Sequence, residues 1–337
     1  MALAVTSLAD LPNERITLLL GAPRSGTTWL AKIFDSHPDV LYRHEPDTVL
    51  RDAAFQRNFA PDELAAVIAP ARDYLRRLFA VRTLKSVGSL PTFDKTYHGS
   101  VTHMARQALV FAMRVAAKLN IAPGFMQSVA IPDQLRDDAF KSLHLVMKSV
   151  SSRGRARLFA EALPGCKIVF IVRDPCGQIA STLRGFALGK FERPVPLKEI
   201  IGTAQADRYG LTEERLFAMP RLEQLAWHWC VLNEKTMDDL EGLPNATLIR
   251  YQDLCLEPIA RSKALFAFCG LSWTAQTEDF VKASSTSNAP DRYFQVYKNT
   301  TESLNKWRSQ LSAEDQATIL GVVRQTKMWA LCAEYDA

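Results

Sequence analysis

A short glycine-containing segment near the start of the chain has the residue types of a phosphate-binding loop. Gly21 to Thr28 reads Gly-Ala-Pro-Arg-Ser-Gly-Thr-Thr and lies between two apolar runs, Ile16–Leu20 and Trp29–Phe34. Glycine lets backbone N–H groups turn toward one point, and the first turn of a helix adds unpaired N–H donors and the positive end of its dipole. A strand, a tight loop and a helix in this order predict an anion site, with an ordinary capped helix start as the alternative.

The spacing of this loop separates it from loops that bind nucleoside triphosphates. Its two glycines and Thr28 match the pattern G-x-x-x-x-G-K-[ST], but Thr27 stands where the lysine belongs. That lysine bridges the outer phosphates, whereas here Arg24 places a cation inside the loop. A kinase or triphosphatase would also need magnesium, for which Asp174 is the only obvious ligand. The sequence therefore favours another anionic donor, and leaves a kinase or a non-catalytic nucleotide-binding protein as alternatives.

The loop also carries a match to a known family. The sulfotransferases that use 3′-phosphoadenosine 5′-phosphosulfate (PAPS) share the motif P-[KR]-S-G-T-[ST]-W, which Pro23-Arg-Ser-Gly-Thr-Thr-Trp29 resembles at every position. The resemblance implies an enzyme that transfers the sulfuryl group of PAPS to a hydroxyl of a carbohydrate or another small or polymeric acceptor and releases PAP, without a metal. The motif residues that it places at the nucleotide are Arg24, Ser25, Gly26, Thr27, Thr28 and Trp29.

A second resemblance to this family follows the apolar run Lys167–Val172. Arg173 ends that run, and Ser181 lies eight residues further on, in a segment that Pro175 opens as a helix. In the family this is the site of the 3′-phosphate. An arginine at the end of a strand and a serine on the next helix can converge on one anion. The alternative is a surface pair of Arg173 with Asp174 and a solvated Ser181.

The resemblance also implies the groups that would carry out catalysis. Leu145-Val-Met-Lys148 resembles the strand whose lysine contacts the phosphosulfate, and two residues later Val150 replaces the histidine base of the cytosolic aryl branch. The chain is therefore expected nearer the carbohydrate, tyrosylprotein and bacterial branches, in which a glutamate after the first motif can be the base. Glu45 occupies that place. His44 and a solvated Glu45 paired with Arg43 or Arg51 are the alternatives, and Arg24 and Lys148 complete the predicted catalytic set.

Two later segments resemble further nucleotide-binding parts of the family. Arg250-Tyr-Gln-Asp-Leu254 is similar to the family's Y-E-D-L, which makes Tyr251 a candidate to pack on the nucleotide, although a core tyrosine is the simpler interpretation. The polar segment Ser284–Lys306, which includes Tyr293 and Phe294, resembles a loop that closes over the nucleotide. Within it, Ser285 and Lys298 are the candidate contacts.

Short β-branched runs alternate with helical patterns, which predicts an α/β, P-loop-like, three-layer fold with a central parallel sheet. Periodic apolar residues predict helices over Leu222–Leu240 and Asp315–Leu331. We expect a single domain over residues 1–337, in which helical inserts at 46–140 and 185–220 form the acceptor site. The five expected strands are Ile16–Leu20, Val40–Tyr42, Leu145–Met147, Lys167–Val172 and Ala246–Ile249.

The composition excludes several other classes of function. The 41 Lys and Arg against 36 Asp and Glu give a net charge of +5 without dense basic runs, so we expect no nucleic-acid partner. No stretch reaches the roughly 18 apolar residues of a membrane span, and the N-terminus lacks the pattern of a signal peptide, which predicts a cytoplasmic enzyme. The six cysteines are expected to be buried thiols, and the six histidines lack the spacing of metal ligands. Nothing in the sequence indicates the oligomeric state.

Overall fold

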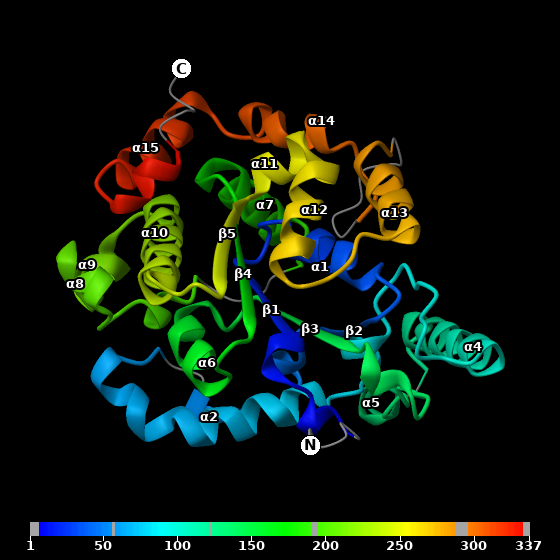
Figure 1. Ribbon diagram of the computed structural model, residues 1–337. Coiled ribbons are helices and arrows are strands. Elements are labelled where there is room, and N and C mark those ends of the chain that lie inside the picture. The colour runs from blue at the N-terminus through cyan, green and yellow to red at the C-terminus, as the bar shows by residue number, and fades with distance from the viewer. Residues whose placement is uncertain (1–6, 56–57, 122, 191–194, 288–295, 333–337) are drawn as a thin grey trace.

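The chain folds around a five-stranded, wholly parallel sheet in the order β2-β3-β1-β4-β5 (Figure 1). The computed structural model describes residues 7–55, 58–121, 123–190, 195–287 and 296–332. This sheet confirms the predicted fold class and all five predicted strands, several of which are longer than expected. The strands are β1 (Ile16–Gly21), β2 (Val40–His44), β3 (His144–Ser149), β4 (Lys167–Val172) and β5 (Ala246–Arg250).

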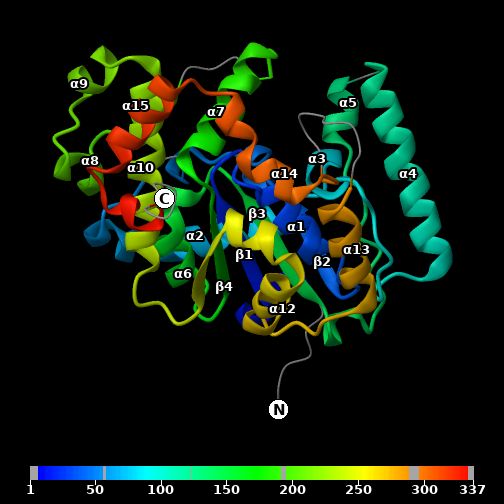
Figure 2. The same ribbon diagram turned by 90° about the horizontal axis from the view of Figure 1, so that it is seen from above.

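Alternate strand residues face two separate hydrophobic layers, because successive side chains of a strand point to opposite faces. Leu18 and Leu20 pack into the larger core and Leu19 into the smaller one. Helices thus cover both faces of the sheet, as a parallel sheet requires (Figure 2). The larger core is covered by α2 (Leu64–Phe79), α6 (Ala156–Ala162), α7 (Pro175–Ala187), α8 (Ala204–Arg208), α9 (Glu213–Ala218), α10 (Arg221–Leu240) and α15 (Ala313–Val323). The smaller core is covered by α1 (Thr27–Asp35), α11 (Tyr251–Leu256), α12 (Pro258–Phe268), α13 (Ala275–Ser285) and α14 (Thr300–Asn305).

The two helices that apolar periodicity predicts differ in how far they extend. The predicted helix Leu222–Leu240 is confirmed as α10. The predicted helix Asp315–Leu331 is wrong in its second half, because α15 ends at Val323 and a separate 3-10 helix covers Lys327–Leu331. Thr326 explains the break: its backbone is extended, and its side chain accepts a hydrogen bond from the N–H of Met328, so it caps a new helical turn.

The segment Ser284–Lys306 is also more ordered than the predicted polar loop. Its first two residues complete α13, and Thr300–Asn305 form α14. Asn299 begins α14 by accepting a hydrogen bond from the N–H of Glu302 through its side chain. Residues 288–295, which include Tyr293 and Phe294, lie outside the described residues.

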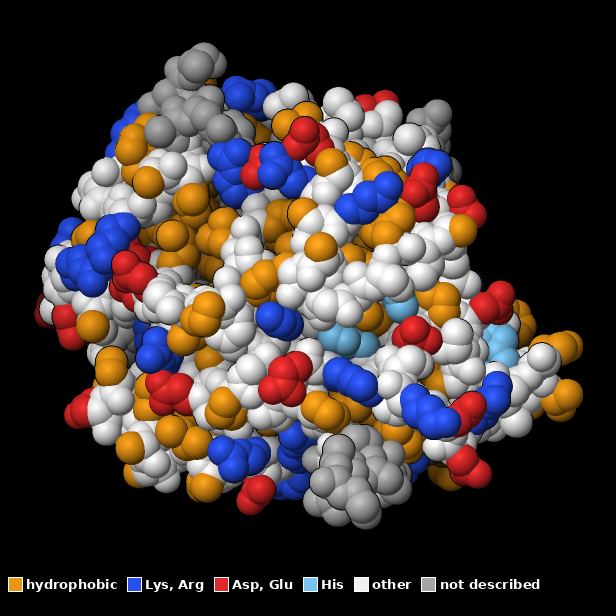
Figure 3. Space-filling view, viewed as in Figure 1, with side chains coloured by type: hydrophobic (Ala, Val, Ile, Leu, Met, Phe, Trp, Pro, Cys, Tyr) orange, Lys and Arg blue, Asp and Glu red, His pale blue; other side chains and the backbone are white. Residues whose placement is uncertain are grey.

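The insert at 46–140 extends beyond the edge strand β2 of the sheet. It contributes α2 on one face, and α3 (Leu84–Val87), α4 (Ser100–Lys118) and α5 (Pro123–Ser128) beside β2 (Figures 1 and 2). The projecting helix α4 carries exposed apolar side chains such as Met104 and Phe111, and hydrophobic surface is visible at this edge in Figure 3. Within the described part of the chain, no helix is both long and apolar enough to cross a bilayer.

All six cysteines are buried thiols, as predicted.

The sheet topology determines where a ligand can bind. From β1 the chain first crosses to β2, and β3 then fills the position between them, whereas β4 and β5 lie on the other side of β1. The carboxyl end of β1 therefore faces the crevice at which open α/β sheets bind ligands. The predicted site segments that follow β1, β2, β3 and β4 all begin at this edge.

Candidate active site

The loop after β1 has a backbone shaped to receive an anion. Arg24 and Gly26 both have left-handed conformations, with φ of 71° and 86°, and no side chain caps the start of α1 at Gly26. The first N–H groups of α1 are thus left for a ligand or water. A Cβ on Gly26 would lie 2.4 Å from the ring of Tyr251, so both the backbone conformation and the space require glycine here.

Side chains of α7 hold this loop and bring the predicted phosphate ligands together. Arg24 Nε donates to Ser181 Oγ at 2.9 Å, and Ser25 Oγ donates to Gln178 Oε1 at 3.0 Å. Arg173 Nη1 donates to the carbonyl oxygen of Arg24 at 3.1 Å, while Arg173 Nε is buried without a hydrogen-bond partner among the described residues. Arg173 Nε does lie 3.7 Å from Asp174 Oδ2, but both side chains are largely buried, so this is not the surface pair of the alternative. A buried guanidinium with an unused donor suits an anion. Arg24 therefore points toward Ser181, and Gln178 is a contact that the sequence did not single out.

Tyr251 lies beneath the loop and joins it to the region of α14. Its ring is buried, and Lys298 Nζ donates to its hydroxyl oxygen at 2.6 Å. The guanidinium carbon of Arg173 lies 5.0 Å from the centre of the same ring. Burial raises the pKa of Tyr251 well above its ordinary value, so its hydroxyl stays neutral. Lys298 thus contacts Tyr251, and Tyr251 supports the loop from the core. Their predicted contacts with the nucleotide stay predictions.

Two other predicted nucleotide contacts lie inside the packed layer. Trp29 is buried in the smaller core, where its indole Nε1 donates to Ser284 Oγ at 2.9 Å. Ser285 is also buried, and its hydroxyl donates to the carbonyl oxygen of Lys282 at 3.2 Å. Trp29 thus connects α1 to α13, whereas the hydroxyl of Ser285 bonds within α13.

The candidate catalytic pair meets where β2 and β3 end. His44 of β2 lies opposite Lys148 of β3 in the sheet register, and the N–H of Glu45 donates to the carbonyl oxygen of Lys148 at 2.8 Å. The Lys148 ammonium forms a short ion pair with Glu45 Oε1 and lies 3.5 Å from Thr28 Oγ1. The pair therefore stands beside the start of α1. Lys85, which the sequence did not single out, lies 3.7 Å from the other carboxylate oxygen of Glu45.

The alternative partners predicted for Glu45 are not observed. Arg43 is fully buried and pairs with Asp133 at 2.6 Å. The carboxylate of Glu45 is 16% exposed and contacts lysines, so a solvated glutamate paired with Arg43 or Arg51 is wrong.

Burial and charge set different protonation properties for the groups around this pair. Burial acts to raise the pKa of Glu45, but the charge and hydrogen bond of Lys148 outweigh it, and the pKa falls below its ordinary value. Burial lowers the pKa of Lys148, and the charge of Glu45 opposes that effect. For His44, burial and then the charge of Lys148 lower the pKa to about 3, and its Nδ1 is hydrogen-bonded to the Tyr42 hydroxyl at 2.8 Å. His44 is thus neutral and weakly basic.

A polar pocket of about 520 Å³ opens beside the Glu45–Lys148 pair. Asp47 and Thr48, in the 3-10 turn that follows Glu45, line this pocket. Ser151, three residues after Lys148, lines it too. Both predicted inserts contribute to its wall, and we call it the arginine pocket. Its lining residues are Asp47, Thr48, Arg51, Asn58, Ser151, Arg153, Gly154, Arg155, Lys198, Glu199, Ile201, Gly202, Thr203 and Leu232.

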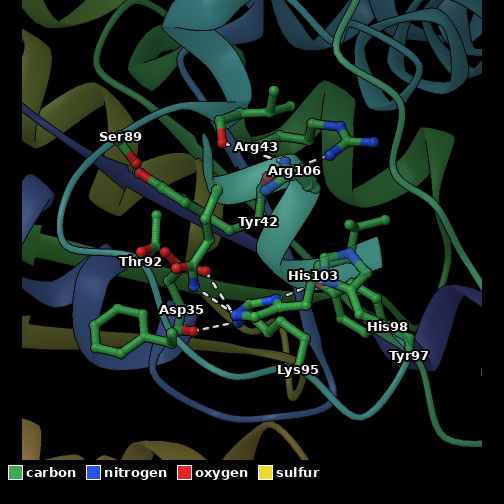
Figure 4. A pocket seen from close by; sticks show the side chains of 14 residues that line it. Asp35, Tyr42, Arg43, Ser89, Thr92, Lys95, Tyr97, His98, His103 and Arg106 are labelled. Carbon is green, nitrogen blue, oxygen red and sulfur yellow. Dashed lines mark hydrogen bonds and ion pairs between the residues drawn. The ribbon is translucent and has the colours of Figure 1, made fainter. Parts of the chain in front are cut away.

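A second pocket, between β2 and α4, is too small for a substrate. Its volume is about 40 Å³, which suffices for little more than water (Figure 4). Lys95 Nζ donates there to Asp35 Oδ1 at 3.1 Å and to the carbonyl oxygen of Val40 at 2.8 Å, and Figure 4 shows this lysine pointing at Asp35. The network joins the insert at 46–140 to the edge of the sheet.

Comparisons with known proteins agree with the motifs in this site. The sequence profile of the sulfotransferase family matches residues 17–275. Carbohydrate sulfotransferase 3 of Mus musculus is 25% identical over 329 residues, which cover 89% of this chain and 64% of that protein. Carbohydrate sulfotransferase 6 of Homo sapiens is 24% identical over 300 residues, or 84% and 71% of the two chains. These relatives confirm the prediction that the chain is nearer the carbohydrate branch than the cytosolic aryl branch.

Solved structures of sulfotransferases are also similar to this chain, at lower sequence identity than these relatives. The sulfotransferase domain from the curacin biosynthetic pathway has a TM-score of 0.46 and 15% identity, covering 94% of this chain and 97% of that one. A mouse sulfotransferase complexed with PAP has a TM-score of 0.42 and 14% identity, covering 98% and 91%. Because the family profile matches well over half of the sequence, from β1 through α12, the chain belongs to the sulfotransferase family.

Proposed function

We propose that this protein transfers the sulfuryl group of PAPS to a hydroxyl of an acceptor and releases PAP. One observation carries the proposal: an uncapped helix start, the Arg173–Ser181 region and the Glu45–Lys148 pair converge at one edge of the sheet. The first two can bind anions, and the third combines a base with a cation. The names of the relatives support a carbohydrate as the acceptor.

The two phosphate-bearing ends of the nucleotide have separate candidate ligands. The N–H groups at the start of α1, with the hydroxyls of Thr27 and Thr28, suit the 5′-phosphosulfate. Arg173, whose Nε has no hydrogen-bond partner among the described residues and lies 3.7 Å from Asp174 Oδ2, suits the 3′-phosphate together with Ser181. Arg24 contacts Ser181, so we place it at this end, and its predicted role in catalysis stays a prediction.

The chemistry requires one bond to form and one to break. The acceptor oxygen attacks sulfur, the bond between sulfur and the bridging phosphate oxygen breaks, and PAP leaves with that electron pair. Glu45 takes the proton of the attacking hydroxyl as general base. Lys148 stabilises the charge that develops on the leaving phosphate. His44 is the less favoured candidate base, because Tyr42 occupies its Nδ1, whereas Glu45 directly contacts Lys148.

The structure gives no support to the kinase or triphosphatase alternative. Asp174, the candidate magnesium ligand, is buried, and its side chain accepts a hydrogen bond from the N–H of Gly177 at the start of α7. It is a helix cap, and a residue engaged in this way is a poor metal ligand. Turnover of PAPS with any acceptor would exclude the non-catalytic alternative.

Calorimetry with PAP and adenosine 5′-monophosphate tests the nucleotide site. A charge-assisted contact contributes about 1.5 to 3 kcal/mol, so PAP should bind at least about tenfold more tightly than the monophosphate. Arg173→Ala should remove most of that difference. Arg261→Ala, which changes an exposed arginine of α12, should retain it. Equal affinities for the two nucleotides in the unmodified protein would refute the assignment of the 3′-phosphate site.

A further inference from the structure

The arginine pocket contains two buried arginines that form no direct ion pair with a carboxylate of the described residues. Arg153 and Arg155 are only 5% and 4% exposed. No carboxylate of the described residues forms an ion pair with either guanidinium, although Glu199 acts on both charges, and Asp47 on that of Arg155, from a longer distance. Arg153 Nε donates to the carbonyl oxygen of Val150 at 3.3 Å, and Arg155 Nη2 donates to that of Ser151 at 2.9 Å and to Ser152 Oγ at 2.8 Å. Both Nη1 atoms are buried without a hydrogen-bond partner among the described residues.

Such an arrangement costs stability unless a further group completes it. Burial lowers the pKa of both arginines, because removing a charged guanidinium from water is unfavourable. Buried charges are normally paired, and buried donors normally have partners. Two buried arginines in one pocket wall with unused donors therefore indicate that an anion binds at this wall.

The two acidic residues of the pocket act on the arginines only from a distance, because their direct partners are other residues. Asp47 Oδ2 accepts hydrogen bonds from Ser149 and Ser152, and Glu199 lies 3.5 Å from His228 Nε2 with its side chain 52% exposed. The pocket also contains Arg51 and Lys198, so its lining has four cationic residues against two acidic ones. Its net charge favours an anionic ligand.

We infer that the acceptor carries a carboxylate or a sulfate ester and that Arg153 and Arg155 bind this group while the acceptor hydroxyl reaches Glu45. The inference rests on the proposed function and names the substrate class of the same site. A guanidinium matches the two oxygens of a carboxylate or sulfate with two parallel N–H donors. The pocket volume of about 520 Å³ is in the usual range for a small-molecule site, and only the turn Pro46–Thr48 separates Glu45 from its wall.

The charge of the acceptor can be tested first without any variant. Cell extract is separated on an anion exchanger into a neutral and an anionic pool, and each pool is incubated with the protein and sulfur-labelled PAPS. We expect labelled products from the anionic pool. Products from the neutral pool alone would overturn the inference while leaving the proposed function intact. If PAP binds but neither pool is labelled, the proposed function fails, and this inference fails with it.

A purified acceptor from the labelled pool then identifies the anionic group. One portion is treated to reduce its carboxylates to alcohols and another to remove its sulfate esters. The proposal predicts that one of the two treatments lowers kcat/KM at least about tenfold, because the arginines lose a charge-assisted partner. The treatment that does so distinguishes the carboxylate from the sulfate. Unchanged kcat/KM after both treatments would contradict the proposal.

Variants connect this effect to the two arginines. Arg153→Gln and Arg155→Gln should each raise KM for the anionic acceptor about tenfold or more and leave the affinity for PAP unchanged. Arg157→Gln is the matched control, since Arg157 lies next to them in sequence but pairs with Glu161 on α6. Thermal unfolding shows whether each variant is folded. Arg153→Lys keeps the charge, so it should raise KM for the anionic acceptor less than Arg153→Gln does. If the arginine variants lost the same factor in kcat/KM with the native acceptor and with its uncharged form, the two arginines would have a purely structural role.

Discussion

At the scale of single residues, the backbone of Glu45 holds its side chain toward Lys148. Glu45 has a left-handed conformation with φ of 45°, which is uncommon for a residue with a Cβ. Its N–H donates to the carbonyl oxygen of Lys148, and its carboxylate contacts the ammonium group of the same lysine. Both ends of Glu45 are thus tied to one residue, and such backbone strain is typical of functional sites. The proposed base, Glu45, and the lysine proposed to stabilise the leaving phosphate, Lys148, thus form one ion pair.

Glu45→Gln should separate the chemical step from nucleotide binding. The amide keeps the shape of the side chain but cannot accept the proton, so turnover should fall by about 10² to 10⁴. The affinity for PAP should change little, because the loop after β1 and Arg173 remain. Single-turnover kinetics with labelled PAPS, together with calorimetry of PAP, measure the two quantities.

Lys85→Gln is the matched control for this variant. Lys85 is the other lysine within 4 Å of Glu45, but its side chain is 50% exposed, so its ion pair should contribute little. If Glu45→Gln kept more than about a tenth of the original turnover while chemistry limits the rate, the base would have to be sought elsewhere, beginning with His44.

At the scale of elements, the contact between the loop after β1 and α11 determines the shape of the phosphate site. Gly26→Ala places a methyl group 2.4 Å from the Tyr251 ring in a backbone conformation that disfavours a side chain. Gly270→Ala is a matched control, because Gly270 also has a positive φ, 72°, but nothing lies within 4 Å of its added Cβ. We expect Gly270→Ala to cost about 1 kcal/mol of unfolding free energy without weakening PAP binding. Gly26→Ala should cost more and lower the affinity for PAP at least about tenfold, as urea unfolding and calorimetry can show.

Similar effects of the two substitutions on PAP affinity would mean that the Tyr251 contact does not shape the site.

The same elements show what the sequence could and could not predict. Strand-end residues such as Lys148 and Arg173 were predictable, because the ends of parallel strands must lie along one edge. The pairing of Glu45 with Lys148, and of Arg24 with Ser181, depends on χ angles and loop conformations that no pattern encodes. The helix break at Thr326 was missed because apolar periodicity continued across a residue that acts as a cap.

The arginine pocket was missed for another reason. Arg153 and Arg155 follow a predicted strand by only a few residues, but their sequence looks like an ordinary charged turn. Their burial results from packing against α10 and the insert at 185–220, which are far away in the sequence. That insert is predicted to help form the acceptor site, and the position of the pocket supports this proposal.

At the scale of the whole molecule, histidines held neutral make the stability of the fold depend on pH. Burial lowers the pKa of His44 to about 3 and those of His98 and His144 to about 4. His44 lies on β2, His98 lies just before α4, and His144 lies on β3. All three therefore affect the free energy of unfolding of the same domain. In the unfolded chain each takes up a proton near pH 6.5, whereas in the folded chain it does not.

The free energy of unfolding should therefore fall as the pH drops from about 6.5 to about 5, because the unfolded state binds more protons in that range. Each histidine contributes a slope of up to about 1.4 kcal/mol per pH unit. Asp174 and Asp239 act in the opposite direction, since burial raises their pKa values, so a variant is needed to isolate one histidine. His144→Gln removes the titrating group and keeps a polar partner for Thr17 Oγ1, which lies 3.0 Å from His144 Nε2. Urea unfolding at several pH values should show a slope shallower by about 1 kcal/mol per pH unit in the variant, and identical slopes would mean that His144 titrates alike in the folded and unfolded chains.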